Sequence, residues 1–206
     1  MAVSIRTAVL SDIPYLYDIC LKTGDNGKDA SSSFTDPWLL GQFYAAPYLF
    51  SDVSLCFVAE ENDIPLGYII ATANTLSFNT WMEKTWLPQI RIRYPLKESK
   101  NPDLSIHERN LISRIHINSL DISEEDLQLI TEYPAHLHID LLPELQGKGC
   151  GRALIQTLST HLKSLGCPGL HLGVARANEG ATAFYLKTGF SVLVESESSF
   201  TMGVKF

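Results

Sequence analysis

The chain has 206 residues, of which 45% are hydrophobic, and a formal charge of -7 from 23 acidic and 16 basic side chains. This length and apolar content suffice for the core of one globular domain. The acidic balance argues against a nucleic-acid partner, because such partners are bound through an excess of Lys and Arg. No apolar run reaches the roughly 20 residues of a spanning helix. Asp12 and Pro14 also precede any signal-peptide core, so we expect no membrane partner and a cytoplasmic protein.

The four cysteines are far apart in the sequence. They form no Cys-x-x-Cys pair and have no neighbouring histidine at metal-ligand spacing. We expect reduced thiols in a reducing compartment. The four residues are Cys20, Cys56, Cys150 and Cys167.

The first half of the chain predicts a strand, a helix and a hairpin. Residues 4–8 favour a strand, and Ser11 is the expected cap of a helix that ends at Gly24. Residues 54–60 and 66–73 flank a turn-rich stretch and predict an antiparallel hairpin.

Residues 75–134 follow no single periodicity. Prolines stand at positions 88, 95 and 102, residues 89–94 are basic and aromatic, and a helix is expected near residues 123–130. We interpret this stretch as an insertion of short helices on the main fold, with a small separate subdomain as the alternative.

The strongest local signal is a strand, a glycine-rich turn and a helix in succession. Residues 136–142 predict a strand that Pro143 ends, because proline has no N–H to donate. A helix follows and is expected to stop at Gly166 and Pro168. Its expected apolar face consists of Leu154, Ile155, Leu158, Leu162 and Leu165.

The turn between them, residues 144–152, is typical of a phosphate site. Glycines allow successive N–H groups to converge, and a helix N-terminus adds about half a positive charge. Lys148 and Arg152 would add full charges. The alternative is an ordinary flexible turn. A Walker loop is excluded by Leu142 and Gly149, and the dinucleotide fingerprint by Arg152. The pattern that fits is Gln-x-x-Gly-x-Gly, from Gln146 to Gly151.

This pattern resembles the acetyl-CoA-binding loop of the GNAT superfamily of N-acetyltransferases. Residues 141–143, 170–174 and 178–190 are similar to further stretches of that family. Residues 133–140 and 21–27 resemble the GNAT-like domain at the C-terminus of O-GlcNAcases and its free-standing bacterial relatives.

The resemblance implies an α/β (α+β) fold. A mixed sheet of about six to seven strands would be flanked by helices, with the fourth and fifth strands splayed apart around the cofactor. Residues 1–206 would form one domain with the insertion at about 75–134. Acetyl-CoA would be bound by Leu141, Leu142, Gln146, Gly147, Lys148, Gly149, Cys150, Gly151, Arg152, Asn178 and Tyr185.

Tyr185 is the predicted general acid. When an amine attacks the thioester, a phenol with an ordinary pKa near 10 can protonate the departing sulfur. The alternative is that Tyr185 packs in the core beside Phe184.

The predicted base lies on the strand before the turn. His136, His138 and Asp140 alternate and so share one face. Asp140 is the first candidate to take the proton from the amine and His138 the second. Two alternatives remain: a metal site, which the resemblance does not require, and histidines that only satisfy neighbouring backbone groups.

The acceptor is a small-molecule or peptide amine. Asp25, Trp38 and His136 are the candidate acceptor-binding residues. Aromatic residues between positions 24 and 50 and in the insertion are further candidates for acceptor binding. Alternatively, they belong to the core or to an oligomer interface. They are Trp38, Tyr44, Trp81, Trp86 and Tyr94. The acidic chain favours a cationic amine, and a monomer or homodimer is expected.

Two functions remain open. One is direct acetyl transfer in a ternary complex, without a covalent enzyme intermediate. The other is a non-catalytic CoA-binding or protein-interaction module, since GNAT-like domains of O-GlcNAcases include ones without catalytic competence.

Overall fold

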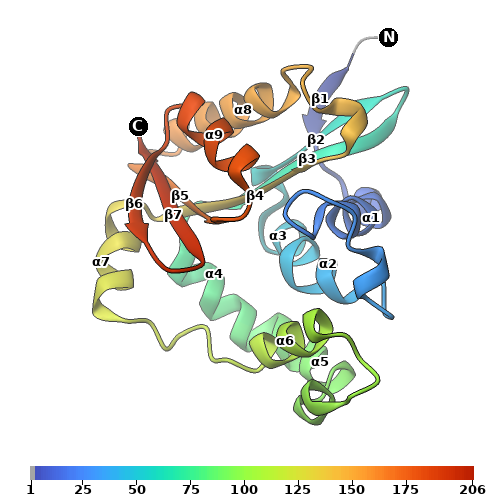
Figure 1. Cartoon of the computed structure of the whole chain (residues 1–206). Coiled ribbons are helices and arrows are strands. Elements are labelled where there is room, and N and C mark those ends of the chain that lie inside the picture. Colours follow the sequence, from blue (N-terminus) through green and yellow to red (C-terminus); the bar gives the residue numbers. More distant parts are fainter. Residues whose placement is uncertain (1–2) are drawn as a thin grey trace.

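The computed structural model describes residues 3–206, and Met1 and Ala2, the first residues of the expected domain, lie outside that part (Figure 1). One mixed sheet of seven strands forms the centre, in the order β1-β2-β3-β4-β5-β7-β6. The strands are β1 (Ser4–Thr7), β2 (Cys56–Glu61), β3 (Ile64–Thr72), β4 (Ala135–Leu141), β5 (Gly169–Ala175), β6 (Ser191–Glu195) and β7 (Ser199–Lys205). All neighbours are antiparallel except β4 and β5, which are parallel.

The helices cover both faces of the sheet (Figure 1). In chain order they are α1 (Ile13–Thr23), α2 (Leu39–Tyr44), α3 (Ala46–Asp52), α4 (Thr75–Trp81), α5 (Leu87–Arg93), α6 (Ile106–Ile115), α7 (Glu124–Glu132), α8 (Cys150–Ser164) and α9 (Glu179–Lys187). Helices α1 to α3 lie on one face and α8 and α9 on the other, while α4 to α6 extend away from the sheet below α2 and α3 (Figure 1). None of the helices in residues 3–206 is long and apolar enough to span a bilayer.

The parallel pair β4 and β5 is joined only at its start. Ala135 pairs with Leu170 and His136 with His171, and no pairing follows. Strand β5 instead pairs along its whole length with β7. The two halves of the sheet therefore separate beyond His136, and the expected fold class with splayed fourth and fifth strands is confirmed.

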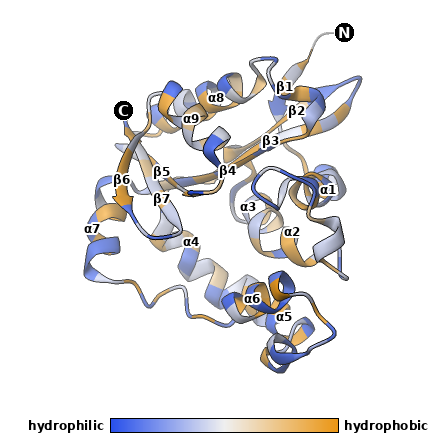
Figure 2. Ribbon diagram, in the orientation of Figure 1, coloured by the Kyte–Doolittle hydropathy of each residue, from blue (hydrophilic) through white to orange (hydrophobic). Residues whose placement is uncertain are grey.

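The sheet separates two hydrophobic cores. The first joins one face of β2 and β3 to α1–α6, and the second joins the opposite face to β5, α8 and α9. Figure 2 shows that the helices around the sheet combine hydrophobic and hydrophilic residues. Strand β4 contributes to both: Leu137 belongs to the second core, and His136 and His138 contact rings of the first. The alternation expected along this strand is present.

Most expected elements form, with shifted ends. The hairpin turn is tighter than expected, because Asn62 and Asp63 both adopt positive φ, 56° and 62°. Strand β3 begins earlier, at Ile64, and includes Pro65 next to a bulge in β2, where a missing N–H is tolerated. Asn178 caps α9, and Gly189 follows it in the left-handed conformation with φ 97°.

Two local predictions are wrong. Ser11 does not cap α1, because residues 10–12 form a 3-10 turn and Asp12 occupies the N-cap. The Asp12 carboxylate instead accepts hydrogen bonds from the Val9 N–H and the Arg6 guanidinium. Leu165 does not face the core either: it is 55% exposed, because the helix has already ended at Ser164.

Residues 75–134 contain α4 to α7, joined in part by a π-helical segment (Met82–Trp86). The helix expected near residues 123–130 is α7, capped by Ser123. Trp86 Nε1 donates to the Gln42 carbonyl at 2.7 Å. Ion pairs neutralise the basic stretch of residues 89–94, since Arg91 pairs with a glutamate and Arg93 with an aspartate. The description of this segment as an insertion in a single domain stays a prediction.

Candidate functional site

A cleft of about 1510 Å³ passes through the gap between β4 and β5. One wall comes from the loop after α1, from α2 and from α6, and the other from α8 and α9. The walls come close at one point, where a Cβ placed on Gly27 would lie 3.9 Å from Asn178 Nδ2. Because elements from both faces of the sheet line it, the cleft extends through the sheet.

The glycine-rich turn lies at the α8 end of this cleft. Gly147 and Gly149 have φ of 72° and 83°, a conformation that side-chain-bearing residues rarely adopt. An added Cβ at either would meet no atom within 4 Å, so the space in front of the turn is open. Within the described residues, the N–H groups of residues 147–152 donate to no acceptor. Donors of this kind at a helix N-terminus are suited to bind an anion.

Gln146 closes the turn onto the preceding strand. Its Nε2 donates to the Leu141 carbonyl at 2.9 Å. The Leu142 N–H donates to Leu66 on the β3 side, and successive residues of a strand point alternately, so Leu141 and Ile139 direct their N–H and C=O toward the gap. Apart from the Leu141 carbonyl, which accepts from Gln146, this edge can pair with the amides of an extended ligand.

Tyr185 lies in the opposite wall, on α9. It is 8% exposed and packs against the Phe184 and Phe190 rings, yet it lines the cleft. Tyr185 therefore both packs in the core and lines the cleft, so its packing does not exclude a role as general acid. Burial, and after it the negative charge of Asp140, raises the pKa of the Tyr185 phenol well above its ordinary value. Tyr185 therefore keeps its proton and can act as a donor.

Asp140 lines the cleft from β4. The Tyr68 hydroxyl donates to its Oδ2 at 2.5 Å, and Tyr68 itself is completely buried. Burial raises the pKa of the Asp140 carboxyl, while the bond from Tyr68 lowers it. A carboxylate with a raised pKa is a better proton acceptor near neutral pH.

His138 lines the same cleft between the rings of Tyr44 and Tyr48. Burial, and after it the positive charge of Arg114, lowers the pKa of His138 to about 4. Its imidazole is therefore neutral near pH 7 and only weakly basic.

His136 has a structural environment instead. Its Nε2 lies 2.7 Å from the Tyr48 hydroxyl and its Nδ1 2.8 Å from Thr75 Oγ1. The Thr75 hydroxyl already donates to the Pro134 carbonyl, so Nδ1 must carry the imidazole proton and Nε2 must accept from Tyr48. Burial, then the charges of His171 and His138, lowers the pKa of His136. Both ring nitrogens of His136 are therefore bonded to side-chain hydroxyls, and not to backbone groups as the alternative interpretation expects.

The structure brings most of the predicted site residues to the cleft but not all of them. Asp25 and Asn178 line it, as do Leu141 and the turn residues Gln146, Gly147, Gly149, Cys150, Gly151 and Arg152. His136 and Leu142 do not line it, and Leu142 is buried in the first core. Lys148 points elsewhere, with its Nζ 4.0 Å from Glu61. Trp38 packs its edge on Tyr17. Among residues 3–206, no group of three or more His, Cys, Asp or Glu side chains is arranged to hold a metal ion.

Sequence reasoning missed several residues in or behind the cleft. Tyr68 lies behind it and donates to Asp140. A tyrosine in an apolar strand looks like any core residue, and only the pairing of Tyr68 with Asp140 across β3 and β4 signals contact. The α6 side chains His107, Asn110 and Arg114 are others. Nothing local marks them, since they reach the cleft only through the path of residues 75–134.

Comparisons with known proteins agree with this geometry. The family model described as the acetyltransferase (GNAT) family matches residues 119–190. The chain is 32% identical to SsHAT, whose crystal structure it matches with a TM-score of 0.89 over 100% of this chain and 98% of that one. The PaiA N-acetyltransferase of Thermoplasma acidophilum, crystallised with coenzyme A, shares the fold at a TM-score of 0.60 and 16% identity, over 100% of both chains.

Protein O-GlcNAcase of Rattus norvegicus is 23% identical over 194 residues, which are 94% of this chain. The chain spans only 20% of the length of that protein. The fold, the cleft and these similarities define one class, and the chain belongs to the GNAT acetyltransferase family.

Proposed function

We propose that this chain is an acetyl-CoA-dependent N-acetyltransferase that passes the acetyl group directly to an amine in a ternary complex. The observation that carries the proposal is that one cleft contains the open glycine turn, the free edge of β4, Asp140 and Tyr185. Membership of the GNAT family supports acetyl transfer in general.

The cofactor pyrophosphate would lie at the N-terminus of α8. The free N–H groups of residues 147–152 supply several donors, and Arg152 on the cleft wall supplies a full charge. The amides of the pantetheine arm would pair with the exposed edge at Ile139 and Leu141. The thioester then lies between β4 and α9, beside Asp140 and Tyr185.

Two side chains of this cleft would move the protons. A protonated amine must first lose a proton, and the raised pKa of Asp140 suits it to accept that proton, directly or through water. The neutral amine forms the new N–C bond as the C–S bond breaks, and Tyr185 donates its proton to the departing thiolate. Burial lowers the pKa of His138 to about 4, which makes its imidazole a weak base.

A covalent route through a cysteine has less support. All four cysteines are free and buried. Cys20 lines the cleft, but burial raises the pKa of its thiol, and the thiolate is the nucleophilic form. Cys150 is the first residue of α8, within the anion site, and faces no base. The buried free thiols also lead us to propose a cytoplasmic location, which cell fractionation would test.

Calorimetry with acetyl-CoA is the first test, because absence of binding would remove every CoA-dependent function. A thiol-release assay over amines, peptides and amino sugars should then show turnover. We expect Tyr185→Phe to lose on the order of 100-fold or more in kcat with unchanged acetyl-CoA affinity. Tyr17→Phe is the matched control, since Tyr17 is buried beside Trp38 and outside the cleft. Binding without turnover of any amine would leave the CoA-binding module.

A further inference from the structure

The cleft differs in charge from the chain as a whole. The chain carries a formal charge of -7. Among the described residues, the cleft is lined by two carboxylates, Asp25 and Asp140, and by four cationic side chains. These are Lys28, Arg114, Arg152 and Lys187. The whole-chain charge therefore does not predict the charge of the ligand that enters.

The four cations divide between the two walls. Arg152 on α8 and Lys187 on α9 belong to the wall with the anion site. Lys28, in the loop after α1, and Arg114, on α6, belong to the other wall. Helix α6 packs in the first core through Leu111, Ile112 and Ile115. Figure 1 shows α6 and α8 on opposite sides of the sheet. A phosphate group at α8 therefore leaves Arg114 uncompensated.

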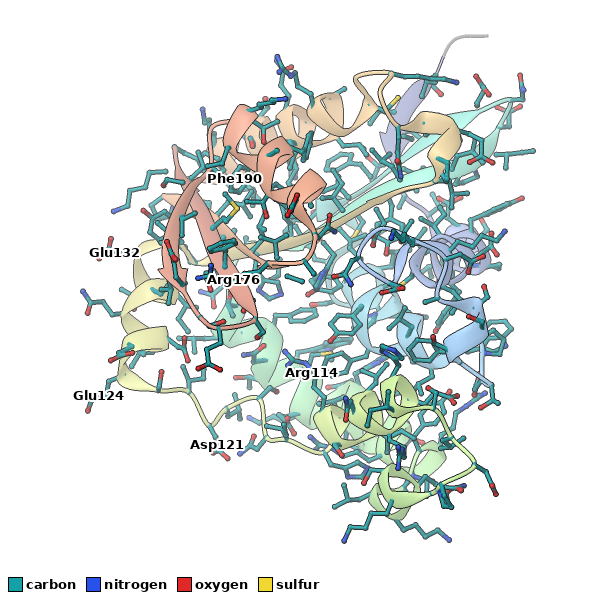
Figure 3. The ribbon with its side chains drawn as sticks, in the orientation of Figure 1. Arg114, Asp121, Glu124, Glu132, Arg176 and Phe190 are labelled. Carbon is teal, nitrogen blue, oxygen red and sulfur yellow. The ribbon has the colours of Figure 1, made fainter. Side chains whose placement is uncertain are left out.

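Arg114 has no carboxylate partner within the part of the chain that the structure describes. Four other arginines, Arg6, Arg91, Arg93 and Arg176, each form an ion pair with a carboxylate. The Arg114 guanidinium lies over the Phe43 ring, 5.9 Å from its centroid. Figure 3 shows it on the side of α6 that faces β4 and α2.

Arg114 is also close to the proposed reaction centre. Its positive charge contributes to the lowered pKa of His138. His138 and Asp140 are alternate residues of one strand face, so their side chains stand roughly 7 Å apart. Arg114, His138 and Asp140 all line the cleft, so an acceptor whose amine lies at Asp140 can extend toward Arg114.

We propose that Arg114 binds an anionic group of the acetyl acceptor, so that the acceptor is a small amine that also carries a carboxylate or a phosphate. A guanidinium presents a fork of donors that matches either anion. The Phe43 ring lies against one side of the Arg114 guanidinium, whose N–H donors can bind a group in the cleft. This inference rests on the proposed function and replaces the purely cationic amine that the acidic composition favours.

Matched amines test the inference. Lysine and cadaverine differ by one carboxylate, and glucosamine 6-phosphate and glucosamine differ by one phosphate. Each would be titrated by calorimetry into CoA-saturated protein and assayed for thiol release with acetyl-CoA. We expect the anionic member of at least one pair to bind at least about 10-fold more tightly, equivalent to about 1.4 kcal/mol. The pair that shows the preference distinguishes carboxylate from phosphate.

Arg114→Gln should abolish that preference and leave unchanged the binding of acetyl-CoA and of the amine that lacks the anionic group. Arg114→Lys should keep part of it. Arg93→Gln is the control, because Arg93 is ion-paired outside the cleft. Equal binding of both members of each pair, equal preference in wild type and Arg114→Gln, or no binding of any anionic amine would overturn the inference. Failure of the proposed function differs from these results, since it shows as absent acetyl-CoA binding or absent thiol release.

Discussion

The two walls of the cleft present their binding groups in different ways. On the α8 and α9 wall the groups are mostly backbone N–H donors, held by a turn in which Gly147 and Gly149 have positive φ. On the α6 wall they are side chains, such as Arg114 and His107, from a segment far from the turn in sequence. The first wall suits a constant ligand and the second a variable one, because side chains can change while the backbone path stays the same.

The largest expected effect is at Asp140, which lines the cleft from β4, between the two walls. Asp140→Asn keeps an acceptor for the Tyr68 hydroxyl but removes the proton-accepting carboxylate. We expect kcat for amine acetylation at neutral pH to fall on the order of 100-fold or more, because a general base contributes roughly that much. Acetyl-CoA affinity by calorimetry should stay the same. A rate close to wild type would transfer the role of base to His138 or to water.

The next prediction tests whether the backbone N–H groups of the α8 wall bind acetyl-CoA. Gly149→Ala introduces a side chain at φ 83°, a conformation that costs roughly 1–2 kcal/mol, and projects it into the open anion site. We expect acetyl-CoA to bind about 10-fold more weakly, since about 1.4 kcal/mol corresponds to that factor.

Gly166→Ala is the matched control for Gly149→Ala. Gly166 has φ 72°, also with open space around its Cβ, but it lies beyond the other end of α8. Both variants should show a lower Tm, and only Gly149→Ala should lose affinity. Equal affinities in the two would contradict the anion site.

A smaller effect on acetyl-CoA affinity should distinguish the two basic residues of the glycine-rich turn. Arg152 lines the cleft and Lys148 does not. Arg152→Ala should weaken acetyl-CoA binding several-fold, since a hydrogen bond to a charged group contributes roughly 1.5–3 kcal/mol and solvent reduces that value at an exposed site. Lys148→Ala should change the dissociation constant by less than about twofold, because an exposed charge outside the contact contributes little. Calorimetry at matched ionic strength measures both, and the reverse order would show that Lys148 reaches the phosphates.

The smallest expected effect is a shift in the pH dependence of kcat/KM. The Tyr68 hydroxyl stabilises the ionised form of Asp140, so Tyr68→Phe should raise the pKa of Asp140 further. The base acts when deprotonated, so kcat/KM rises with pH through this pKa, and the rising limb should move to higher pH. The activity loss should be several-fold at low pH and vanish at high pH. An unchanged profile would mean that Asp140 does not control the rate.

The sequence predicts the α8 wall far better than the α6 wall. Strand β4, the glycine turn and the Asn178 cap depend on residues close in sequence, so their patterns are visible locally. Arg114 reaches the cleft only because α4 to α6 fold back beneath α2, a path set by contacts such as Trp86 with the Gln42 carbonyl. No local pattern encodes that contact.

Distant partners also decide the placement of two predicted site residues. Lys148 has the right charge and neighbours, but the orientation of its side chain depends on Glu61 in another strand. His136 shares a face with Asp140, yet Tyr48 and Thr75 use both of its ring nitrogens. Residue type and spacing therefore locate a face, while partners from distant segments decide which side chains on it remain available.

The short junction of β4 and β5 also has a kinetic consequence. Because only two residue pairs join these strands, the cleft passes between them and is lined by elements from both faces of the sheet. If the chain transfers acetyl groups as proposed, each substrate has its own entrance and neither blocks the exit of the other's product. Initial-velocity plots should then intersect, and either substrate should be able to bind first.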